Sequence, residues 1–218
     1  MIAEGGRRER KKQQTRELIA ETARRLFEER GFEAVTVAEI AREADVAEKT
    51  VFNYFPTKED LFYNRMESFE EELLAAIRER GPGVSVLEAF RGFIDQPRGM
   101  LAEPRADDAR ERLARITRVI TESPALQARE QQVLRRYTES LAALIAEDTG
   151  AAPDDVRPWV AANALMGIHR SLIEFVRTRT LAGGDDPATL ARDLRGHADR
   201  AFALLESGLE GYAPGSDR

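Results

Sequence analysis

Helix patterns follow one another along this chain from residue 15 to residue 208, and no segment between them shows the alternation typical of a β-strand. In the first pattern Ile19, Ala23 and Leu26 recur at helical spacing. Nine helices are expected, over residues 15–30, 36–44, 47–53, 57–80, 85–94, 105–121, 124–148, 153–181 and 187–208. The sequence therefore predicts an all-α fold.

Residues that stop and start helices separate these segments. Gly31 is placed to end the first helix. Thr36 and Glu39 have the spacing of a capping box, in which each side chain binds the backbone N–H of the other residue. Ser85 and Glu88 repeat that pattern after the Gly81-Pro82-Gly83 break. Residues 95–104 contain two prolines and a glycine, which predicts an irregular loop.

Composition excludes several classes of function. The 218 residues include no cysteine, which excludes thiol chemistry and thiolate zinc sites, and their two histidines leave little material for a histidine-based metal site or triad. We expect no metal site, no cofactor and no enzyme activity. The longest apolar stretch, residues 159–168, is shorter than the roughly 18 residues of a membrane-spanning helix. The charged N-terminus is unlike a secretory signal, so a cytoplasmic protein is expected.

The charge is distributed unevenly. The chain carries a net charge of −6, yet residues 1–16 hold six basic and two acidic residues, a net charge of +4, which leaves −10 for the other 202. A basic segment attached to an acidic body suits a protein that contacts phosphate at one end. A solvated tail without a partner gives the same pattern, and both interpretations stay open.

Residues 36–62, TVAEIAREADVAEKTVFNYFPTKEDLF, place two short helices on either side of a tight turn at Asp45-Val46. In a helix-turn-helix the first helix crosses the DNA backbone and the second enters the major groove. The second helix can pack through Val51, Phe52 and Phe55. Its remaining residues are then left for bases and phosphates: Glu48, Lys49, Thr50, Asn53 and Tyr54. An ordinary helical hairpin with a solvated polar face is the alternative.

Further residues make the segment 15–62 resemble the N-terminal domain of the TetR/AcrR family of transcriptional regulators. The matching residues are Leu18, Ile19, Ala23, Leu26, Phe27, Gly31-Phe32, Thr36-Val37, Ile40-Ala41, Ala44, Val46, Thr50, Tyr54-Phe55-Pro56, Lys58-Glu59 and Leu61. The resemblance implies a homodimeric repressor on a palindromic operator. It implies five parts: a basic flexible arm (1–14), a helix-turn-helix DNA-binding domain (15–60), a connecting helix (61–80), a ligand-binding and dimerisation domain (81–210) and a tail (211–218).

The resemblance also implies roles for individual residues. Thr36 would place a hydroxyl and a helix N-terminus on a phosphate, and Tyr54 and Lys58 would hold the DNA backbone. The residues expected to bind DNA are Arg7, Arg8, Arg10, Lys11, Lys12, Thr36, Val37, Glu48, Lys49, Thr50, Asn53, Tyr54 and Lys58.

Two positions depart from the family pattern. Asp45 stands in the turn where the family usually has glycine, and aspartate tolerates the left-handed backbone better than most residues. Ala47 stands where a serine often caps the second helix, which removes a cap worth roughly 1 kcal/mol.

The C-terminal helices carry the remaining expectations. By the resemblance, the last two helices pair with a second copy, and the expected dimer-interface residues are Ala162, Leu165, Leu172, Leu194, Ala198, Ala201 and Leu205. A purely intramolecular core is the alternative. A small, largely apolar ligand is expected beside Phe90, Phe93, Met100, Arg118, Trp159, Met166, His169 and Phe175, although such residues also form ordinary cores. The segment 114–130 loosely resembles a branch whose body is thought to bind acyl-CoA-like ligands.

The expected mechanism is release of DNA when a ligand tilts the helix at 57–80 and spoils the spacing of the two recognition helices. A transcriptional activator of the same fold is an alternative. A helical ligand-binding or adaptor protein without DNA binding is another.

Overall fold

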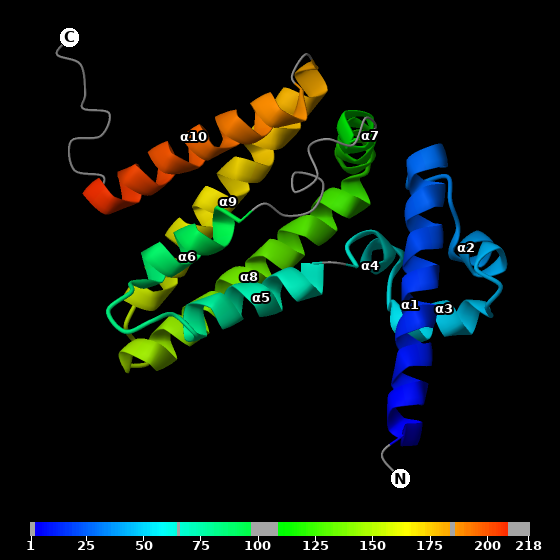
Figure 1. Cartoon of the computed structure of the whole chain (residues 1–218), viewed down its shortest axis with the longest axis horizontal. Helices are drawn as coiled ribbons and strands as arrows, with labels where there is room; N and C mark the ends of the chain where they lie inside the picture. Colours follow the sequence, from blue (N-terminus) through cyan, green and yellow to red (C-terminus); the bar gives the residue numbers. More distant parts are fainter. Residues whose placement is uncertain (1–2, 65, 97–108, 184–185, 209–218) are drawn as a thin grey trace. The chain divides into compact units, whose positions relative to one another are not determined.

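The computed structural model describes residues 3–64, 66–96, 109–183 and 186–208 (Figure 1). These residues form ten α-helices and no β-strand, so the all-α prediction is confirmed. The helices are α1 (Ala3–Arg30), α2 (Val37–Glu43), α3 (Glu48–Tyr54), α4 (Lys58–Phe62), α5 (Met66–Arg78), α6 (Val86–Ile94), α7 (Ala109–Glu122), α8 (Pro124–Thr149), α9 (Arg157–Ala182) and α10 (Pro187–Ser207). None of them, within the described residues, is both long and apolar enough to cross a membrane.

The tenth helix arises because the segment 57–80, predicted as one helix, forms two. α4 ends at Phe62 and is followed by its C-cap residue Tyr63, whose N–H bonds to the Glu59 carbonyl at 2.9 Å. The Asn64 side-chain amide then donates to the Leu61 carbonyl at 3.2 Å. That carbonyl would accept from the backbone four residues later in a continuous helix, so the asparagine side chain replaces a helical hydrogen bond.

Two other helix starts differ from the prediction. α1 begins at Ala3, so residues 3–14, which were expected to precede the first helix, are part of it. α9 begins at Arg157, whereas Pro153 was expected to open it. Asp155 explains the later start, because its carboxylate accepts the Arg157 N–H at 2.9 Å and pairs with the Arg157 guanidinium at 2.6 Å. Residues 105–108 and most of the predicted loop at 95–104 lie outside the described residues.

The chain divides into two compact units, which we call the N-terminal unit and the C-terminal unit. The N-terminal unit comprises Met1–Phe69 and Arg115–Gln131, and the C-terminal unit comprises Glu70–Ala114 and Gln132–Arg218. Both α7 and α8 therefore have one end in each unit. No local pattern in the sequence predicts that the corner between α7 and α8 belongs with the first four helices.

A single hydrophobic core holds the N-terminal unit together. Its fully buried side chains include Ile19 and Phe27 of α1, Ile40 of α2 and Val51 of α3. The α7–α8 corner adds Val119, Ile120 and Leu126 to the same core. Polar contacts fix that corner in place: Ser123 Oγ donates to the Glu33 carboxylate at 2.6 Å, Arg129 pairs with Asp60 at 2.6 Å, and the Tyr63 hydroxyl donates to the Leu126 carbonyl at 3.1 Å.

The C-terminal unit is built on α9 and α10, which lie side by side (Figure 1). Arg179 on α9 pairs with Asp193 on α10 at 3.0 Å. α6 adds Phe90, whose ring centroid lies 6.3 Å from that of Phe202 on α10. α5 and α8 are joined by Glu70, which accepts from the Arg136 guanidinium at 2.9 Å and the Ser140 hydroxyl at 2.7 Å.

Candidate nucleic-acid interface

The turn between α2 and α3 is a Schellman motif with an aspartate at its left-handed position. The Val46 N–H bonds to the Ala41 carbonyl at 2.9 Å, and the Asp45 N–H bonds to the Arg42 carbonyl at 3.2 Å. Asp45 has a φ of +53°, the one positive φ found for a non-glycine among the described residues. The tight turn predicted at this position is confirmed, and aspartate occupies a conformation that glycine adopts more easily.

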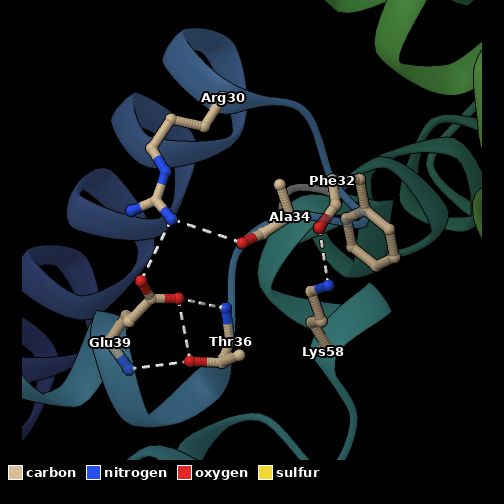
Figure 2. Close-up of polar contacts among 6 residues, drawn as sticks. All are labelled: Arg30, Phe32, Ala34, Thr36, Glu39 and Lys58. Carbon is tan, nitrogen blue, oxygen red and sulfur yellow. Dashed lines mark hydrogen bonds and ion pairs between the residues drawn. The ribbon is translucent and has the colours of Figure 1, made fainter.

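The predicted capping box at the start of α2 is present and is reinforced by an arginine (Figure 2). The Thr36 hydroxyl accepts from the Glu39 N–H at 3.2 Å, and the Glu39 carboxylate accepts from the Thr36 N–H at 2.8 Å. Arg30 of α1 donates to the same carboxylate at 3.0 Å and to the Ala34 carbonyl at 3.3 Å. Donation from the Thr36 backbone and hydroxyl, with Arg30 adding to it, lowers the pKa of Glu39 to about 2.

This geometry limits what the Thr36 side chain can offer to a phosphate. Its hydroxyl proton is donated to Glu39 at 2.9 Å, so the capping box already uses the donor that was expected to contact DNA. The neighbouring Val37 is half-buried and packs against the core. The capping box thus fixes the direction in which α2 starts. The exposed backbone N–H groups at this helix end remain available to bind phosphate.

α3 has one buried side and one exposed side. Val51 and the following Phe55 are buried in the core of the N-terminal unit. The exposed residues are Glu48, Lys49, Phe52 and Asn53, while Thr50 and Tyr54 are half-buried. No side chain caps the helix at Ala47, as the sequence predicted. A seven-residue helix with a wholly exposed side suits insertion into a groove.

Phe52 corrects one of the packing predictions and adds a residue to the site. It was expected to pack in the core, but 45% of its surface is exposed. The reason is helical spacing: Phe52 lies four residues after the exposed Glu48, whereas Phe55 lies four residues after the buried Val51. An exposed phenyl ring on this helix can contact a thymine methyl group.

Lys58, expected to hold the DNA backbone, is bound within the protein (Figure 2). Its ammonium donates to the Phe32 carbonyl at 2.6 Å and lies 4.1 Å from the centroid of the Phe32 ring. Burial lowers the pKa of Lys58, and nearby carboxylates, with Glu33 the largest contribution, oppose the shift. In this conformation Lys58 joins the start of α4 to the end of α1.

The basic residues near the N-terminus lie in the first turns of α1. Arg8, Arg10, Lys11 and Lys12 are all exposed there, and the side chain of Arg7 lies outside the described residues.

The residues expected around a ligand differ in burial and in the unit to which they belong. Phe90, Phe93 and Met166 are buried in the C-terminal unit, but Trp159 is 45% exposed at the start of α9. Arg118 is exposed and belongs to the N-terminal unit. Met100 lies outside the described residues.

Two ligand candidates on α9 are half-buried. The Phe175 ring stacks on His197 with 4.6 Å between centroids. Burial, with a further contribution from Arg170, lowers the pKa of His169 to about 4, so this imidazole is neutral at pH 7.

Four of the expected dimer-interface residues are core residues instead. Ala162, Leu165, Leu172 and Ala198 are at most 6% exposed within one chain, so their side chains cannot form a surface for a second copy. Helical spacing identifies an apolar side of a helix without indicating which part of the protein covers it. Leu194, Ala201 and Leu205 are half-buried. Three exposed apolar residues lie at the start of α9, namely its N-cap residue Val156, Trp159 and Val160, and Leu181 is exposed near its end.

The capped α2, the Schellman turn and the half-exposed α3 together define a helix-turn-helix, the DNA-binding element of many transcriptional regulators. Comparison with known proteins identifies the family of regulators to which this helix-turn-helix belongs. Residues 19–63 match the family model described as bacterial regulatory proteins of the tetR family, and residues 84–210 match the MftR C-terminal domain. The chain belongs to the TetR family of transcriptional regulators.

Individual relatives agree with this assignment. The HTH-type transcriptional regulator TcmR of Streptomyces glaucescens is 31% identical over 159 residues, which cover 70% of this chain and 69% of the relative. The putative mycofactocin biosynthesis transcriptional regulator MftR of Mycobacterium tuberculosis is 26% identical over 157 residues, covering 72% and 76%.

Solved structures share the fold. FadR of Bacillus subtilis, in complex with stearoyl-CoA, has a TM-score of 0.53 and 24% identity and covers 88% of this chain and 97% of its own. SmeT, in a triclosan complex, has a TM-score of 0.55 and 18% identity and covers 94% and 99%.

Proposed function

We propose that this regulator is a repressor that binds a palindromic operator as a homodimer and leaves it when a ligand occupies the C-terminal unit. The observation that carries DNA reading is the division of α3 into a buried side and an exposed side. Glu48, Lys49 and Asn53 supply donors and acceptors for base edges and phosphates, and Phe52 supplies an apolar contact. A 30% identical relative, the HTH-type transcriptional repressor AcnR of Corynebacterium diphtheriae, supports repression.

Homodimer formation is supported by the exposed apolar residues of α9. Val156, Trp159 and Val160 are between 45% and 62% exposed and lie three and four residues apart, so they share one side of the helix. Two-fold symmetry would give an inverted-repeat operator with half-sites about one duplex turn apart, near 34–36 Å.

An acyl-CoA-like ligand is supported by the stearoyl-CoA bound to FadR, which shares this fold. Ligand binding lowers the affinity for DNA only if the ligand binds the DNA-free form of the protein more tightly than the DNA-bound form. The α7–α8 corner offers a route, because Ser123 and Arg129 bind Glu33 and Asp60 inside the N-terminal unit while both helices continue into the C-terminal unit.

The experiment that tests this function is transcription in vitro from a promoter captured with the full chain. Genomic fragments bound by the protein are recovered, and the promoter nearest the strongest site is transcribed with and without the protein. Lower transcript levels, restored by stearoyl-CoA but not by coenzyme A alone, are expected. Higher transcript levels would indicate an activator. Recovery of no fragment above background would favour the adaptor alternative.

A further inference from the structure

The three asparagines of this chain differ in what their side chains bind. The Asn64 amide donates to the Leu61 carbonyl at 3.2 Å, and the Asn163 amide donates to the Trp159 carbonyl at 2.8 Å. The Asn53 side chain is exposed and makes no hydrogen bond within the part of the chain that the structure describes. Both the donor and the acceptor of the Asn53 amide are therefore available to a partner.

Folding does not explain an asparagine at position 53. Asn53 lies inside α3, and asparagine forms helices less readily than alanine because its side chain competes for backbone hydrogen bonds. Its side chain is exposed, so packing in the core does not stabilise it either. A partner outside the chain that binds the amide would account for this residue type.

Helical geometry directs the Asn53 side chain away from the core. Each residue turns an α-helix by about 100°, so residues two positions apart lie about 200° apart around the helix axis. Val51 is completely buried, and Lys49 and Asn53 are two positions from it on either side. Thr50 and Phe52 are one position from Val51 and lie to the sides. Lys49 and Asn53 therefore point most directly away from the core, and into the groove when α3 lies in it.

Of these two residues, Asn53 has the side chain that can specify one base. The Lys49 ammonium is a cation, which phosphates attract as well as guanine does. The Asn53 amide is neutral and carries a donor beside an acceptor. In the major groove guanine presents two acceptors, cytosine a donor, and thymine an acceptor and a methyl group, whereas adenine presents a donor, N6, beside an acceptor, N7. Adenine is therefore the base that satisfies both groups of the amide at once.

We propose that Asn53 binds an adenine in each half-site of the operator. Its nitrogen Nδ2 donates to adenine N7, and its oxygen Oδ1 accepts from the N6 amino group. This inference rests on the proposed operator binding and names the base at one position of each half-site. Because the amide is uncharged, the contact adds sequence preference without releasing counterions, so it does not contribute to the salt dependence of binding.

The test combines one variant with one base analogue. An operator is selected from random duplexes with the full-length protein and, separately, with full-length Asn53→Ala. The variant should keep its melting temperature, because alanine is the better helix former and no side-chain hydrogen bond within the described residues is lost. Each adenine of the selected half-site is then replaced in turn by 7-deazaadenine, which has a C–H group in place of N7 and still pairs with thymine.

At one adenine the analogue should weaken binding of the unsubstituted protein and have no further effect on Asn53→Ala. The remaining adenines are the matched controls, at which the two losses should multiply. Asn53→Ala should weaken binding to the operator by at least about fivefold per half-site, the lower end for a bidentate base contact. It should lose the preference for adenine at that one position and keep the slope of log affinity against log salt.

A selected half-site without adenine would overturn the inference, as would losses that multiply at every adenine. Either result leaves operator binding intact, because the unsubstituted protein has still selected a site. If the unsubstituted protein selects no site, the proposed function fails and this inference fails with it.

Discussion

At the scale of single residues, Asp45 is the residue of the turn between α2 and α3 whose backbone conformation is the least favourable. Its φ of +53° is one that glycine adopts without a clash between the side chain and the backbone. We therefore expect Asp45→Gly to raise the stability of the N-terminal unit by about 1 kcal/mol, with Asp45→Ala lowering it. Thermal denaturation of the three proteins measures the change. A lower melting temperature for the glycine variant would contradict the assigned turn.

Phe52 is the residue whose role differs most from its sequence-based prediction. Because nearly half of its surface is exposed, Phe52→Ala should leave the melting temperature almost unchanged and weaken binding to the selected operator. If the ring contacts a thymine methyl, replacing one thymine by uracil should weaken binding of the unsubstituted protein and have no further effect on the variant. Losses that add in full would show that the ring and the methyl group do not touch.

At the scale of helices, local signals in the sequence predicted the ends well. The capping boxes predicted at Thr36 and Ser85 are both present. Each depends on residues within three positions, so no tertiary contact was needed to predict it. The sequence did not predict that the segment 57–80 divides into α4 and α5, because this division depends on the hydrogen bond that the Asn64 side chain donates to the Leu61 carbonyl. The burial of the dimer candidates on α9 and α10 was not predicted, because only tertiary packing decides which apolar side of a helix is covered.

The start of α2 should make stability depend on pH. The folded pKa of Glu39, about 2, lies below its ordinary value of 4.5, so the unfolded chain binds its proton first as the pH falls. The stabilisation is complete above pH 4.5 and is lost between pH 4.5 and 2. Glu39→Gln keeps a capping-box side chain and removes the charge. Its melting temperature should lie below that of the unsubstituted protein at pH 6 and approach it at pH 2; a constant difference would contradict the assignment.

At the scale of the whole molecule, the proposed dimer depends on the exposed apolar residues at the start of α9, and not on the buried residues among those that the sequence suggested. Val160 is 57% exposed on α9, so a charge there should cost the monomer little and should oppose association. We expect Val160→Asp to be monomeric by sedimentation and to bind the operator weakly. Val84→Asp, at a 40% exposed valine between α5 and α6, is the matched control and should remain dimeric. A dimeric Val160→Asp would place the interface elsewhere.

The central claim is that the exposed side of α3, presented twice by a symmetric dimer, reads a particular DNA sequence. Selection of bound duplexes from a random pool by the full-length chain tests it most directly. We expect enrichment of an inverted repeat whose half-site centres lie about 10 base pairs apart, one turn of the duplex. Enrichment of a single half-site without symmetry would contradict the dimer. Retention of all sequences alike would contradict base reading by α3.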